Sequence, residues 1–191
     1  MLRPAMRWCD AEGRRLDTVP LSDPRVAAVE VRECGEPLVD LREVGVLRLG
    51  RRPACPGEAP ARLRLGVVDR LVTAQTLLPA GLRLLMIQGY RPDPPEAPHA
   101  TGAAADLTLC TVEGAPLWMG SAPQDTRSPH RHTTAPGPDP VAAENRRSLS
   151  MAMTTAGFVN YHAAWWHWSY GDRYWACLSG ARYAGYGPLD R

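Results

Sequence analysis

Two histidines and an aspartate in the second half of the chain have the side-chain types of a metal site. His99 and Asp106 are seven residues apart, and His167 lies in a later, tryptophan-rich segment. Zinc accepts imidazole nitrogen and carboxylate oxygen as ligands, and a catalytic zinc site keeps three protein ligands and one open position. Asp106 stands between Ala105 and Leu107, where a lone buried carboxylate is costly unless it is paired or binds a cation. The three residues are therefore predicted metal ligands.

The elements around these residues should bring them together. Ala103–Cys110 is predicted to be a strand that contains Asp106, and His99 lies in the loop before it, after the proline-rich stretch Pro92–Pro98. From Phe158 onward, aromatic-rich segments broken by glycines predict antiparallel strands, one of which contains His167. A single histidine in such a segment is more often a packed, hydrogen-bonded core residue than a ligand, so the prediction depends on the three residues together.

The rest of the chain predicts a mixed fold. Periodic apolar positions indicate a helix over Leu63–Leu78, and Asp139–Pro140 is typical of a helix start, with an end near Ala156. Further predicted elements are strands around Val26–Arg32, Val44–Leu49 and Leu82–Ile87, a hairpin turn at Val112–Gly114, and long loops at Arg51–Ala61 and Ser121–Pro138. We expect a single α+β domain over residues 1–191, with a central antiparallel sheet and helices packed on it.

Composition argues against several classes of function. The formal net charge is only +2, so we expect neither a nucleic-acid nor a membrane partner. All 22 basic residues are arginine, which excludes a Schiff-base lysine. The five cysteines form no C-x-x-C pair, the N-terminus lacks an apolar secretory region, and no apolar run reaches 18 residues. These features favour a cytoplasmic location with reduced thiols.

Three segments resemble a known family. Gly89–Pro92 (GYRP), Pro98–Leu109 (PHATGAAADLTL) and Trp165–Ala176 (WWHWSYGDRYWA) closely resemble the D-alanyl-D-alanine dipeptidases associated with vancomycin resistance. The likeness extends in order over nearly the whole chain. It implies a zinc-dipeptidase-like fold with Zn²⁺ as cofactor, held by His99, Asp106 and His167. It also implies that Arg91 supports the substrate carbonyl oxygen. Fe²⁺ is the alternative, because two histidines and one carboxylate also bind non-haem iron.

The family pattern is broken around these ligands. Its catalytic glutamate, three residues before the last ligand, is Ala164 here. A positioned general base contributes about 10²–10⁴ in rate, so hydrolysis by the family mechanism should be crippled. Gln124 stands at the position where the family has the acidic residue that binds the substrate ammonium, and Asp125 is the next residue. The family serines around the first ligand are Ala97 and Ala100, and its helical insertion before that ligand is reduced to a few residues.

Three explanations are open for Ala164: an engineered substitution, an inactive protein that only binds metal or ligand, or a repurposed enzyme. Retention of all three ligands and Arg91 favours the third. The expected reaction is then a non-hydrolytic step on a small amino-acid-like or peptide-derived substrate, such as an elimination, isomerisation, cyclisation or rearrangement. Natural-product biosynthesis is the expected setting, and the family's dipeptidase activity remains an alternative.

Further site residues follow from this interpretation. His162 is the candidate general base, because histidine titrates near neutral pH and strand alternation would place it on the same side as Ala164. Trp118 and Asp125 are the candidate substrate-binding residues. His130 and His132 lie in the long loop and are either solvated or part of a lid over the site.

Overall fold

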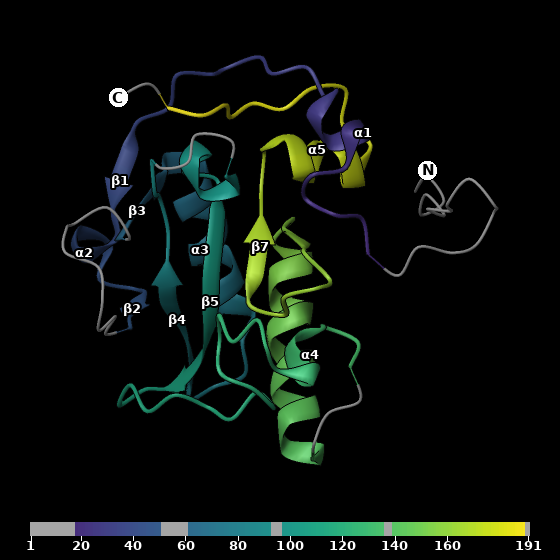
Figure 1. The fold of residues 1–191 in the computed structure, drawn as a ribbon. Coiled ribbons are helices and arrows are strands. Elements are labelled where there is room, and N and C mark those ends of the chain that lie inside the picture. The colour runs from purple at the N-terminus through teal and green to yellow at the C-terminus, as the bar shows by residue number, and fades with distance from the viewer. Residues whose placement is uncertain (1–17, 51–60, 93–96, 136–138, 190–191) are drawn as a thin grey trace.

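A computed structural model describes residues 18–50, 61–92, 97–135 and 139–189. Its main feature is a five-stranded sheet in the order β2-β4-β5-β7-β6 (Figure 1). The strands are β2 (Arg48–Leu49), β4 (Leu82–Gln88), β5 (Ala104–Thr111), β7 (His167–Ser169) and β6 (Val159–Asn160). Neighbouring strands are antiparallel, except that β2 pairs parallel with β4. The predicted α+β class with a largely antiparallel sheet is confirmed.

The helical layer covers one face of this sheet. Helices α3 (Leu65–Leu77) and α4 (Pro140–Thr155) bury apolar side chains in the same core as alternate residues of β4 and β5. In β5 those residues are Ala105, Leu107 and Leu109, so side-chain alternation turns Asp106 to the opposite face. Figure 1 shows α3 behind β4 and β5.

Local sequence signals account for the two long helices. In α4, the Asp139 carboxylate accepts a hydrogen bond from the Ala142 N–H at 2.8 Å, and Pro140 occupies the first turn. In α3, the buried positions recur at helical spacing, and the helix ends just before Pro79. Both predicted helices, as well as the strands over Leu82–Ile87 and Ala103–Cys110, are confirmed within one or two residues.

The N-terminal strand predictions are largely wrong. Residues Pro24–Ala27 form a short helix, α1, because the Asp23 carboxylate caps the Arg25 N–H at 2.9 Å and proline fits the first turn. Only Val31 of that segment forms a bridge, with Ala184. Helix α2 (Leu41–Val44) then precedes β2, so the second predicted strand is much shorter than expected.

The C-terminal strand prediction fails after Gly171. Residues Arg173–Ser179 form helix α5, because Asp172 caps the Trp175 N–H at 2.8 Å and Gly180 ends the helix at φ 72°. These caps outweigh the strand preference of the aromatic residues. A two-stranded sheet of β1 (Leu38–Asp40) and β3 (Arg62–Arg64), with the 3₁₀ helices η2 (Pro98–Thr101) and η3 (Pro129–Arg131), completes the fold.

Several predictions concern the connecting segments. The hairpin turn at Val112–Gly114 is confirmed by two backbone hydrogen bonds. The Thr111 N–H donates to the Ala115 carbonyl at 2.9 Å, and the Gly114 N–H donates to the Thr111 carbonyl at 2.9 Å. The loop predicted at Arg51–Ala61, most of Pro92–Pro98, and the N-terminal seventeen residues lie outside the described residues. Cys34, Cys110 and Cys177 are free thiols. Among the described helices, none has the length and apolar character to cross a membrane.

Candidate metal centre

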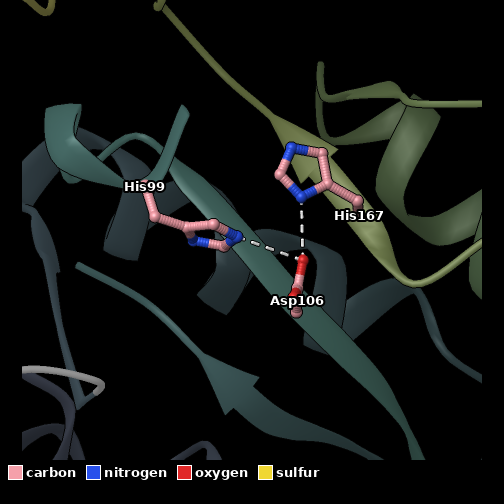
Figure 2. A group of neighbouring side chains, drawn as sticks. All are labelled: His99, Asp106 and His167. Atoms are coloured by element: carbon pink, nitrogen blue, oxygen red, sulfur yellow. Dashed lines mark hydrogen bonds and ion pairs between the residues drawn. The ribbon is translucent and has the colours of Figure 1, made fainter. Parts of the chain in front are cut away.

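The structure brings His99, Asp106 and His167 together on the face of the sheet opposite α3 and α4 (Figure 2). His99 Nε2 lies 3.3 Å from Asp106 Oδ1, and His167 Nδ1 lies 2.8 Å from the same oxygen. The three donor atoms are within 4.8 Å of one another, and all three residues are buried. This convergence is what a three-ligand metal site requires.

Strand pairing positions two of the three residues. Asp106 in β5 lies directly opposite His167 in β7, so the sheet register alone places their side chains side by side. His99 comes from η2, and Gly102 at φ 69° turns the chain from η2 into β5. A Cβ at Gly102 would lie 2.6 Å from Leu38 Cδ2, so the turn needs both the left-handed conformation and the absent side chain.

A hydrogen bond behind the site fixes the tautomer of His99. Its Nδ1 lies 2.9 Å from the Gly89 carbonyl oxygen, which can only accept, so Nδ1 carries the hydrogen. In the neutral ring, Nε2 then presents a lone pair to Asp106 Oδ1 at 3.3 Å. Two acceptors this close repel each other unless a proton or a cation lies between them. The pair therefore fits either a protonated His99 or a metal ion between the two atoms.

His167 is held differently. Its Nε2 is buried and has no hydrogen-bond partner among the described residues, so no carbonyl or carboxylate orients the ring from behind. The ring instead contacts His99 edge-on at 5.0 Å between centroids and Tyr161 at 6.0 Å. Packing and the contact with Asp106 position this ligand.

The charge of Asp106 completes the case for a cation. Burial by itself opposes ionisation of Asp106, but the adjacent His99 and His167 outweigh burial and hold its pKa well below the usual range. A negative charge therefore persists in a buried position, where it requires compensation. The donor set of two imidazoles and one carboxylate suits Zn²⁺ or Fe²⁺.

A residue that the sequence argument treated as a loss lies against the site. Gln124 Nε2 is 2.6 Å from Asp106 Oδ2 and 3.1 Å from Gln88 Oε1. Gln88 ends β4, where a register irregularity brings it opposite Asp106. The only sequence signal for Gln88 is a polar residue at the end of an apolar strand. The family resemblance marks the position of Gln124, but nothing in the sequence indicates its bond to Asp106.

The two predicted catalytic residues lie on exposed segments. Arg91 follows β4, and its backbone N–H donates to the His99 carbonyl at 3.1 Å, which anchors this segment beside η2. His162 lies in a turn rather than a strand, because the Ala164 N–H bonds back to the Tyr161 carbonyl at 2.8 Å. The strand-alternation argument that paired positions 162 and 164 is therefore wrong.

The predicted substrate-binding residues make contacts within their own loops. The half-exposed Trp118 donates from Nε1 to Asp139 Oδ2 at 2.8 Å, at the start of α4. The Asp125 carboxylate accepts the Arg127 N–H at 3.1 Å and the Ser128 N–H at 3.2 Å. These bonds do not join either residue to the metal ligands.

The long loop that carries His130 and His132 is anchored by helix α4. The carbonyl oxygens of both histidines, and that of Met119, accept hydrogen bonds from the buried Arg146 guanidinium of α4. A guanidinium with three backbone acceptors holds the two ends of the loop together. The loop is thus tied to the helical layer at these three carbonyls.

A mixed sheet that presents two histidines and a carboxylate at one point defines a protein with a candidate three-ligand metal site. Comparison with known proteins is more specific. Residues 93–179 match the family model described as D-ala-D-ala dipeptidase, and this span contains all three predicted ligands. This match agrees with the resemblance of the chain's motifs to D-alanyl-D-alanine dipeptidases.

Individual relatives agree with this assignment. A D-alanyl-D-alanine dipeptidase of Synechocystis is 26% identical over 218 aligned positions, which cover 78% of this chain and 87% of the relative. The Escherichia coli enzyme of the same name is 32% identical over 46% of this chain and 55% of its own length. The Enterococcus faecalis enzyme is 32% identical over 44% of this chain and 41% of its own length.

Proposed function

We propose that this chain is a zinc-dependent enzyme that uses the dipeptidase scaffold for a non-hydrolytic step on a small amino-acid- or peptide-derived substrate. Elimination, isomerisation, cyclisation and rearrangement are the reaction types considered, with natural-product biosynthesis as the setting. One observation carries the proposal: a buried, charged His99–Asp106–His167 cluster stands beside a position, Ala164, that cannot exchange a proton.

The cluster supports the metal-dependent part. Asp106 supplies the negative charge, and the bond from His99 to the Gly89 carbonyl orients one imidazole lone pair toward it. A divalent cation held there supplies Lewis acidity, which polarises a carbonyl or carboxylate oxygen of a substrate. Zn²⁺ is preferred to Fe²⁺ because the sequence resembles zinc dipeptidases.

Ala164 supports the non-hydrolytic part. It lies three residues before His167, whose N–H donates to the Ala164 carbonyl at 2.9 Å, so the two positions are rigidly connected. Ala164 is 8% exposed and belongs to the main hydrophobic core. A methyl group neither accepts a proton from water nor returns one to a leaving amine, and about 10²–10⁴ in rate is lost without such a group.

Two exposed residues complete the proposal. Arg91, beside η2, is suited to pairing with a substrate carboxylate or an anionic oxygen. His162 is the proposed proton acceptor, held in its turn by a bond from the Thr133 N–H to its carbonyl at 2.9 Å. Replacing His162 with alanine should then abolish turnover of the true substrate while zinc remains bound, and full turnover would remove His162 from the mechanism.

Dipeptide hydrolysis is the second candidate, because the relatives are named D-alanyl-D-alanine dipeptidases. A binding protein without catalysis is the third. The test is release of D-alanine from D-Ala-D-Ala by the zinc-loaded protein, with a chelator as control. We expect little release. A rate matching that of the E. coli relative under the same conditions, abolished by chelator, would establish the second candidate and reject our proposal.

Two further measurements separate enzyme from binding protein and zinc from iron. Elemental analysis of protein purified without added metal should find zinc, and iron in its place would reject the choice of cofactor. Mass spectrometry after incubation with amino acids and dipeptides should reveal a single main product that has the substrate's mass or has lost a small molecule such as water or ammonia. Two products whose masses add up to that of the substrate plus one water indicate hydrolysis. If no substrate changes although zinc is bound, the binding-only candidate is supported.

A further inference from the structure

Three side chains form a line of hydrogen bonds that ends on the predicted metal ligand. Gln88 at the end of β4 accepts from Gln124 at 3.1 Å, and Gln124 donates to Asp106 Oδ2 at 2.6 Å. Asp106 Oδ1, the other oxygen of the same carboxylate, faces both histidines. The carboxylate is therefore divided, with one oxygen toward the histidines and one toward Gln124.

The orientation of the Gln124 amide is determined by its neighbours. Asp106 Oδ2 and Gln88 Oε1 can only accept, so the group between them must be the –NH₂ with its two hydrogens. The reversed amide would place its oxygen against both acceptors. Gln88 is 2% exposed and Asp106 is 5% exposed, so water cannot replace this donor freely.

The backbone of Gln124 is unusual. Its φ is 66°, and it is the one non-glycine residue with positive φ in the part of the chain that the structure describes. Side chains with a Cβ rarely adopt this region, and such conformations persist where surrounding contacts over-determine them. The hydrogen bonds of its side chain to Gln88 and Asp106 are among the contacts that hold Gln124 in this conformation.

We infer that Gln124 is a positioning residue of the metal centre: its amide holds Asp106 Oδ2 so that the carboxylate presents only Oδ1 to a divalent cation. Gln88 orients the Gln124 amide for this role. The loop position that the family resemblance assigns to an acid that binds the substrate ammonium serves the ligand carboxylate instead. This inference rests on the metal centre of the proposed function and not on any reaction.

The test compares metal binding by wild type, Gln124→Leu, Gln124→Gly and the control Thr126→Ala. Thr126 is an exposed residue of the same loop, two positions from Gln124. Competition with a chromophoric chelator gives the Zn²⁺ affinity, and the visible spectrum of bound Co²⁺ reports coordination number. We expect both Gln124 variants to bind Zn²⁺ about 10–100-fold more weakly, the range that is typical of residues behind a ligand, and to alter the Co²⁺ spectrum. Thr126→Ala should match wild type.

Gln124→Gly also separates positioning from a general structural role. Glycine relieves the positive φ, which offsets part of the cost of losing the amide. The metal-free Gln124→Gly variant should therefore melt at a higher temperature than Gln124→Leu, while the Zn²⁺ affinity of both variants falls. It also keeps the inference testable if Gln124→Leu fails to fold. Zn²⁺ affinities of both variants within twofold of wild type would overturn the inference. A wild type that binds no Zn²⁺ would instead overturn the proposed function.

Discussion

Two regions of the molecule differ in how they hold their polar residues. In the paired strands β5 and β7, Asp106 and His167 lie directly opposite each other and are both buried. The surrounding turns carry Arg91, His162 and Asp125 as exposed residues. The sheet fixes a side chain through register, which many backbone bonds share, whereas a turn fixes it through a few local bonds. Two of the three predicted ligands are therefore fixed by the sheet, whereas the other predicted site residues depend on their turns.

The largest expected effect comes from removing the negative charge of Asp106, which is paired with His167 across the two strands. Asp106→Asn keeps the shape but removes the anionic donor, so Zn²⁺ affinity should fall by more than the roughly 10–100-fold typical of residues behind a ligand. A chelator competition measures it. Asp69→Asn, at an exposed position of α3, is the matched control. An Asp106→Asn affinity equal to that of the control would show that Asp106 is not a ligand.

A second prediction concerns the framework next to β7. Gly171 and Gly180 both have positive φ angles, 78° and 72°. A Cβ at Gly171 would lie 2.5 Å from the ring of Tyr186, whereas a Cβ at Gly180 would meet open space. Gly180→Ala should cost about 1–2 kcal/mol of unfolding free energy from the left-handed backbone alone. Gly171→Ala should cost more, because a rigid ring blocks the methyl group. Equal losses in denaturant unfolding would show that Tyr186 moves aside freely.

The smallest effect is expected at the start of α4, in the loop region. Asp139→Ala removes the cap on the Ala142 N–H and should lower Tm by about 2–4 °C without changing Zn²⁺ affinity. That backbone bond holds the pKa of Asp139 below its usual value, so the cap is present above the usual carboxyl pKa and is lost as pH falls through the lowered one. The Tm difference between wild type and variant should therefore disappear in strong acid. A large change in Zn²⁺ affinity would contradict the separation of the two regions.

The sequence predicts the regular elements well and the site around the ligands less well. Helices α3 and α4 and strands β4 and β5 follow from apolar periodicity, an Asp–Pro start and bounding prolines, all of which act locally. Helix α5 is not predicted, because the aromatic residues of Arg173–Ser179 favour a strand and the capping residues Asp172 and Gly180 are short local signals.

The roles of Gln88 and Gln124 could not be predicted, because they depend on long-range placement. A register irregularity in β4 and a positive φ in a distant loop bring the two amides to Asp106. Neither feature leaves a pattern in the sequence. The turn at His162 was missed for a related reason, since the alternation rule holds only within a strand and β6 ends at Asn160.

The central claim is that an intact metal centre coexists with a missing hydrolytic base. The most direct test measures D-alanine release from D-Ala-D-Ala by zinc-loaded wild type, Ala164→Glu and Ala164→Gln. We predict little release by wild type and by Ala164→Gln, which adds bulk without a base, and at least about 10²-fold more by Ala164→Glu. Release by wild type equal to that of Ala164→Glu, or an equal gain in Ala164→Gln, would contradict the claim.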